Sequence, residues 1–105
     1  MFADRDEIVE LLKKHNGDGK LIVVDFFAKW CGPCKMISPQ VEKLEQEYNH
    51  NVIVRKVDVD ENEEFSHECN VGGMPTFLFF KNMKQVGKVV GANLEAIHNT
   101  IQAHL

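Results

Sequence analysis

Two cysteines separated by two residues are the side chains in this sequence best suited to chemistry. They lie in the segment Trp30-Cys31-Gly32-Pro33-Cys34-Lys35. A pair at this spacing can close a tight disulfide at a turn, and the thiolate form of cysteine attacks disulfides and binds metal ions. The residue types therefore indicate thiol–disulfide exchange or a metal site.

The cysteine pair lies where an apolar strand is expected to end and a helix to begin. The start of a helix carries unpaired N–H groups and a partial positive charge of about +0.5, which favours a thiolate. We therefore expect Cys31 to be the more readily ionised thiol, with Gly32 leaving its sulfur open to a bulky protein substrate. Cys34, one turn into the helix, should be more buried and act second. Pro33 suits the first turn because its missing N–H would have no partner there.

Two charged residues fall in segments that are otherwise largely apolar. Asp25 lies inside the apolar run 21–27, so we expect desolvation to raise the pKa of its carboxyl group. Lys56 has the same strand parity as Val52 and Val54, which favours a side chain that points inward toward the same site. The alternatives are a solvated carboxylate at a strand end and an edge-strand lysine whose amine reaches water.

Zinc binding is the main alternative function for the cysteine pair. A structural zinc site takes four ligands, and His67 and Cys69 could complete a set. Residues two apart do not share a helix face, so we favour disulfide chemistry and predict no metal ion. For Cys69, the odd third cysteine, we favour a small packed side chain over a regulatory thiol.

The elements that would position these residues begin with four predicted helices. Their ranges are 4–16, from Cys34 to about Tyr48, 61–69, and a final helix after Asn93. Asp4 with Glu7, and Asp60 with Glu63, offer capping boxes for the first and third helices. Pro39 lies inside the second, where we expect a kink.

Four strands are predicted between these helices, at 21–27, 52–59, 76–80 and 85–90. The nearly continuous apolar run of the first is typical of a strand buried on both faces of a parallel sheet. The turn at 81–84 joins the last two strands into an antiparallel hairpin. The element order therefore predicts an α/β fold in which helices cover both faces of a mixed sheet.

Length, charge and cysteine content exclude several classes of protein. The 105 residues suit a single domain spanning 1–105, and the net charge of −4 gives no electrostatic reason to bind nucleic acid. No apolar run approaches the roughly 18 residues of a membrane span. Acidic residues occupy the place of a signal peptide's apolar stretch, and three cysteines are too few for a secreted disulfide framework. We therefore expect a reducing compartment, the cytosol or the nucleus.

Taken together, these motifs resemble the thioredoxin family, close to its cytosolic eukaryotic type. A lone Cys-x-x-Cys would be a weak signal, but Gly-Pro inside the pair, Trp30 before it and Met-Pro-Thr later in the chain make it specific. The resemblance runs from about Leu21 to Leu105 and rests on the segments 25–35, 56–60, 74–77 and 91–93.

The resemblance implies the thioredoxin fold, a central mixed sheet of four to five strands flanked by four helices, with the first strand reduced to Phe2-Ala3 or absent. It also implies that Pro75 follows a cis peptide bond beside the cysteine pair. A flat apolar surface around Cys31 would bind substrates. The residues expected there are Trp30, Gly32, Pro33, Met74, Pro75, Thr76, Gly91 and Ala92.

The activity that the resemblance implies is reduction of protein disulfides. The Cys31 thiolate would attack a substrate disulfide, Cys34 would resolve the mixed disulfide, and Asp25, supported by Lys56, would accept the Cys34 proton. The implied partners are disulfide-containing proteins and an NADPH-dependent thioredoxin reductase, so no bound cofactor is expected, and we expect a monomer. Gly-Pro between the cysteines argues against a glutaredoxin or a disulfide isomerase. A binding protein whose redox state gates a complex is the alternative class.

Three positions depart from the pattern of the family or of some of its members. Phe27 stands where many relatives have tryptophan, and Met83 stands where the hairpin usually has glycine, which would strain or reshape that turn. Gly73 occupies a place where some animal relatives carry a further cysteine, which excludes dimerisation through that position. None of the three touches the thiol chemistry.

Overall fold

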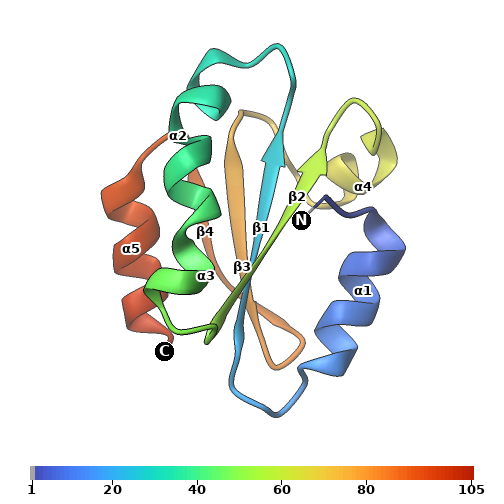
Figure 1. Ribbon diagram of the computed structural model, residues 1–105. Coiled ribbons are helices and arrows are strands. Elements are labelled where there is room, and N and C mark those ends of the chain that lie inside the picture. Colours follow the sequence, from blue (N-terminus) through green and yellow to red (C-terminus); the bar gives the residue numbers. More distant parts are fainter. Residues whose placement is uncertain (1) are drawn as a thin grey trace.

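A four-stranded mixed sheet forms the centre of the computed structural model, which describes residues 2–105 (Figure 1). The strands are β1 (Leu21–Phe27), β2 (Val52–Asp58), β3 (Thr76–Lys81) and β4 (Lys84–Val90). Their order is β2-β1-β3-β4, with β1 and β2 parallel and β3 antiparallel to both of its neighbours. The predicted α/β fold with a mixed sheet is therefore confirmed.

Helices cover both faces of this sheet. They are α1 (Arg5–Lys14), α2 (Gly32–Glu42), α3 (Leu44–Glu47), α4 (Glu63–Glu68) and α5 (Leu94–Ala103). In Figure 1, α1 and α4 lie on one side of the sheet and α2, α3 and α5 lie on the other. None of the helices in the described part of the chain is long and apolar enough to cross a membrane.

The central strand β1 contributes side chains to two separate apolar cores, because successive side chains of a strand point to opposite faces of the sheet. Leu21 and Val23 pack under α2, α3 and α5, whereas Ile22, Val24 and Phe26 pack under α1 and α4. This explains why the strand is apolar at every position except Asp25. It also means that the one charged side chain of β1 has to be accommodated inside the protein.

Two helix boundaries differ from the sequence prediction. The long second helix continues through Pro39 but breaks at Lys43, whose N–H donates to the Gln40 carbonyl three residues back. This tighter turn separates α2 from α3, so the described chain has five helices where four were expected. The predicted Asp60 cap is also wrong, because Asn62 begins α4 without a side-chain cap. The capping box of Asp4 and Glu7 is confirmed.

The N-terminal segment forms a single parallel bridge to β2. Phe2 pairs with Lys56, and the Ala3 N–H donates to the Lys56 carbonyl at 2.8 Å. The first strand of the family is therefore reduced to these two residues, one of the two outcomes expected. The bridge places the Phe2 ring beside the Lys56 side chain.

The β3–β4 hairpin turns through two residues with positive φ, Asn82 at 51° and Met83 at 68°. Glycine adopts this conformation without the clash that a Cβ causes. We expect Met83→Gly to raise the free energy of unfolding by about 0.5–1 kcal/mol, measured by urea unfolding. The matched change Met36→Gly, on the exposed face of α2, should lower it by about 1 kcal/mol. A loss at both positions would show that the Met83 turn is unstrained.

Candidate active site

The cysteine pair lies at the junction where β1 leads into α2. Cys31 is the N-cap of α2, and a disulfide joins it to Cys34, with the two Cα atoms 5.3 Å apart. The Cys31 sulfur accepts the Cys34 N–H at 3.2 Å, and Pro33 occupies the first turn as predicted. A thiolate formed at Cys31 on reduction would therefore face a helix N-terminus, which stabilises negative charge.

The prediction that Cys34 is more buried than Cys31 is wrong for this disulfide form. Cys31 is 5% exposed and Cys34 is 6% exposed. The bond draws both sulfurs into one turn, where Ala28 and the partly buried Met74 pack against them. Gly32 and Pro33 remain exposed, and nothing lies within 4 Å of where a Gly32 Cβ would be. The cysteine pair is therefore open to approach over these two residues.

Asp25 lies in the interior of the protein, on a cavity that it shares with Cys34. The side chain is 2% exposed, and its Oδ1 atom has no hydrogen-bond partner within residues 2–105. Burial raises the pKa of Asp25 from 3.8 to about 7, although the charge of Lys56 opposes the rise. This cavity holds about 550 Å³ and is also lined by Ser38 and Glu42. Desolvation of this carboxyl group, predicted from the sequence, is confirmed.

Lys56 points inward, as its strand parity predicts. Although β2 is an edge strand of the sheet, the alternative in which the amine reaches water is wrong. The residue is 7% exposed and lies opposite Asp25 in the β1–β2 register. Its Nζ atom donates to the Ser38 hydroxyl at 2.6 Å and lies 3.6 Å from the Glu42 carboxylate. The ammonium thus lines the same cavity as Asp25 but makes its short contacts with α2.

Several apolar residues that the resemblance groups around the cysteine pair are exposed. Trp30 is 67% exposed, and Pro33 and Ala92 are exposed as well. Two further apolar residues are exposed, Met36 at 77% and Val90 at 57%. Neither of them was predicted from the sequence. The exposure of Met36 could have been predicted, because Met36 lies outside the apolar stripe that α2 buries.

The resemblance also places the segment around Pro75 at the substrate-binding surface. The Met74–Pro75 bond is cis, as expected, and the buried Pro75 carbonyl accepts the Gly91 N–H at 2.7 Å. Thr76 was expected to contact substrate, but its side chain is fully buried and its hydroxyl donates to the Gly73 carbonyl. Thr76 therefore stabilises the turn behind the surface and contributes no side chain to it.

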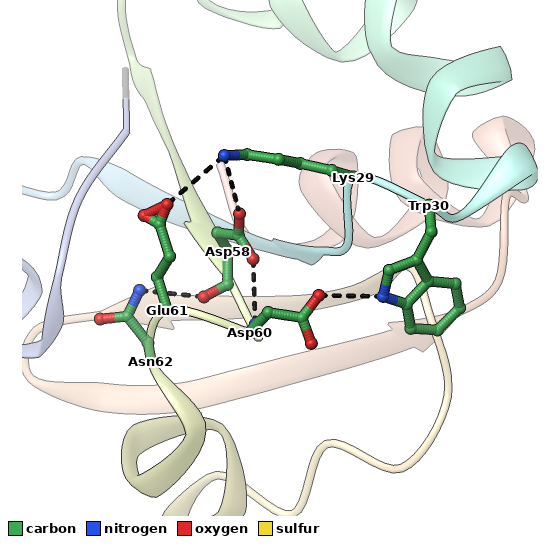
Figure 2. A network of polar contacts seen from close by, with 6 residues as sticks. All are labelled: Lys29, Trp30, Asp58, Asp60, Glu61 and Asn62. Atoms are coloured by element: carbon green, nitrogen blue, oxygen red, sulfur yellow. Dashed lines mark hydrogen bonds and ion pairs between the residues drawn. The ribbon is translucent and has the colours of Figure 1, made fainter.

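A network of charged residues holds Trp30 in place (Figure 2). The Trp30 indole N–H donates to Asp60 at 2.9 Å, and the Asp60 backbone N–H donates to the buried Asp58 carboxylate at 2.9 Å. Lys29 lies 3.8 Å from Asp58 and 3.5 Å from Glu61. The hydrogen bond from Trp30 to Asp60 could not be predicted, because nothing local in the sequence links residue 60 to residue 30.

The zinc set considered from the sequence is not assembled. Across residues 2–105, no three or more His, Cys, Asp or Glu side chains are grouped so that they could hold a metal ion. Cys69 is free and partly buried, and it packs against the core under α1. Burial raises the pKa of its thiol, which favours the packed side chain over a reactive one.

A redox-active cysteine pair at the start of a helix, beside a cis-proline segment on a mixed sheet, defines the class of thiol–disulfide oxidoreductases. The family model Thioredoxin matches residues 5–103. The chain belongs to the thioredoxin family, and Cys31 and Cys34 are its redox-active cysteine pair.

Individual relatives agree with this assignment. The thioredoxin of Homo sapiens is 52% identical over 78% of this chain and 77% of its own length. The X-ray structure of Fasciola hepatica thioredoxin superposes with a TM-score of 0.91 at 45% identity, covering 98% of this chain and 96% of that one. Thioredoxin-T of Drosophila melanogaster is 45% identical over 83% of this chain, which spans 55% of that longer relative.

Proposed function

We propose that this chain reduces disulfide bonds in other proteins, with Cys31 as the attacking thiol and Cys34 as the resolving thiol. The observation that carries the assignment is the position of Cys31 as the N-cap of α2, with the Cys34 N–H directed at its sulfur at 3.2 Å. Only the first thiol of the pair has this environment. Cys34 lies inside the first turn and borders the cavity that contains Asp25.

The reaction then takes two exchange steps. The Cys31 thiolate attacks one sulfur of the substrate disulfide, forms a mixed disulfide and displaces the other substrate sulfur as a thiolate. Cys34 loses its proton and attacks the Cys31 sulfur, which releases the second substrate thiolate. The substrate gains two electrons, and the chain ends with the Cys31–Cys34 disulfide found in this structure.

Asp25 is the proposed acceptor of the Cys34 proton. Both residues line the same cavity, and the pKa of Asp25, raised by burial to about 7, suits proton transfer near neutral pH. Lys56 is proposed to support this carboxylate through its charge at longer range, without forming an ion pair with it.

The proposed substrate-binding surface is the exposed apolar area around the cysteine pair. Its members are Trp30, Gly32, Pro33, Met74, Gly91 and Ala92, with Met36 and Val90 added from the structure. Pro75 lies beneath this surface and shapes it through the cis bond. A flat apolar surface of this kind fits an extended segment of protein on either side of a disulfide.

We further propose that an NADPH-dependent thioredoxin reductase restores the dithiol. The chain would then need no bound cofactor or metal ion, since two cysteines hold both electrons of the cycle. Residues 1–105 would act as one monomeric domain in a reducing compartment, the cytosol or the nucleus, without nucleic acid or membrane as partners.

Insulin reduction tests the proposed function directly. With NADPH and thioredoxin reductase, the chain should cleave the disulfides of insulin and consume NADPH in proportion. Cys69→Ser is the matched control and should behave as the unaltered chain, because Cys69 lies outside the site. If insulin stays intact while the chain still binds disulfide-containing proteins, the chain is a binding protein and not a reductase.

A further inference from the structure

The Lys56 ammonium has two carboxylates within the same cavity. Asp25 faces it from β1, and Glu42 faces it from α2. Within residues 2–105, the carboxylate at ion-pair distance from Nζ is that of Glu42, at 3.6 Å, and Ser38 accepts the 2.6 Å hydrogen bond from the same atom. The buried carboxylate thus lacks an ionic partner, while the more exposed one has it.

Burial alone would favour the opposite pairing. A buried charge without a partner is far less stable than an exposed one, so an ammonium free to choose would turn to Asp25. Contacts on both sides hold Lys56 where it is. The rings of Phe2 and Phe27 lie 5.9 and 5.5 Å from Nζ, within the range of cation–π attraction, and α2 supplies Ser38 and Glu42.

We propose that Ser38 and Glu42 are positioning residues that hold the Lys56 ammonium on α2 and thereby leave Asp25 without an ionic partner. This inference rests on the proposed function, in which Asp25 accepts the Cys34 proton. A carboxylate paired with an ammonium is a weaker base than a buried unpaired one. Glu42 therefore sets the strength of the base without touching either sulfur.

Lys56 is the cation that can respond to a change at Glu42. The other charged or titratable groups that line the cavity are Cys34, Lys29 and Lys35. Lys29 lies in ion pairs with Asp58 and Glu61, and Lys35 is exposed on α2. The β3 neighbour of Asp25 is Phe77, which carries no charge.

The test begins with Glu42→Gln, which removes the carboxylate charge at an exposed position. The ammonium should then turn toward Asp25 and lower its pKa by about one pH unit, read by carboxyl ¹³C NMR on the reduced protein. Ser38→Ala should shift the titration in the same direction by less, and Glu42→Asp should restore most of the original value. Glu10→Gln, on α1 across the sheet, is the control for net charge and should cause no shift.

A second background separates positioning from direct repulsion between the two carboxylates. If Glu42 acts through Lys56, the shift caused by Glu42→Gln should largely disappear when Lys56→Met is already present. An equal shift in both backgrounds, or a shift no larger than that of Glu10→Gln, overturns the proposal.

Stopped-flow kinetics of mixed-disulfide resolution links the positioning to the proposed function. The pH midpoint of this step should move down together with the pKa of Asp25 in Glu42→Gln. A fixed midpoint with a shifted NMR titration would overturn the role of Asp25 as proton acceptor and leave the positioning supported. An unshifted NMR titration would overturn the positioning alone.

Discussion

Cys34→Ser is expected to yield a chain that captures its substrates covalently. The Cys31 thiolate still occupies the N-cap of α2 and can attack a disulfide, but no thiol remains within reach to resolve the mixed disulfide. Turnover should fall below detection. Adducts with protein substrates should accumulate in cell extract, appear on non-reducing gels, and be released by dithiothreitol.

Two matched serine variants complete this experiment. Cys31→Ser should neither turn over nor form adducts, because a hydroxyl at the helix start does not attack sulfur. Cys69→Ser should turn over normally, since its thiol packs against the core under α1. Adducts on Cys31→Ser but not on Cys34→Ser would reverse the assignment of the attacking and resolving thiols.

Asp25→Ala is expected to slow the second exchange step while making the folded chain more stable. Without the carboxylate, Cys34 has to lose its proton to water, and resolution of the mixed disulfide at pH 7 should slow by roughly 10²-fold. Stopped-flow kinetics can separate this step from the first attack, which should be unchanged. A second step of unaltered rate would remove Asp25 from the mechanism.

The stability effect of Asp25→Ala follows from the raised pKa of this carboxyl group. Between pH 3.8 and about 7 the folded chain keeps a proton that the unfolded chain has lost, so the free energy of unfolding falls as pH rises through this window. Above about pH 7 the free energy of unfolding is lower by roughly 4 kcal/mol than it would be below pH 3.8.

Urea unfolding of the oxidised protein across this pH range checks the effect. Asp25→Ala should lack the decline and should exceed the unaltered chain in stability above pH 7. Asp6→Ala, whose side chain is 92% exposed, is the control and should keep the decline. Parallel pH curves for Asp25→Ala and the unaltered chain would show that the buried carboxyl group is not destabilising.

The fold could be predicted from the sequence because its signals are local. The run 21–27 became β1 with the predicted bounds, since a strand between two helical layers needs apolar residues on both faces. The capping side chains of Asp4 and Asn93 likewise bond to neighbours three residues away. The break at Lys43 was missed because the apolar stripe continues across it to Leu44.

Only the part of the candidate site that depends on residue type and local spacing could be predicted from the sequence. The cysteine pair and the desolvated Asp25 follow from spacing and from an apolar surrounding sequence. Contacts between distant segments do not, and they include the hydrogen bond from Trp30 to Asp60 and the ion pair of Lys56 with Glu42. Parity placed Lys56 inside, but only the packed helix α2 determines which carboxylate its amine meets.

The central claim, that Cys31 is the attacking thiol, is tested most directly by mapping the substrate linkage in the Cys34→Ser adducts. Digestion without reduction, followed by mass spectrometry, identifies the cysteine that carries the substrate peptide. The linkage should lie on Cys31 in every adduct, with Cys69 recovered as a free thiol. A substrate peptide linked to Cys69, with Cys31 free, would contradict the claim.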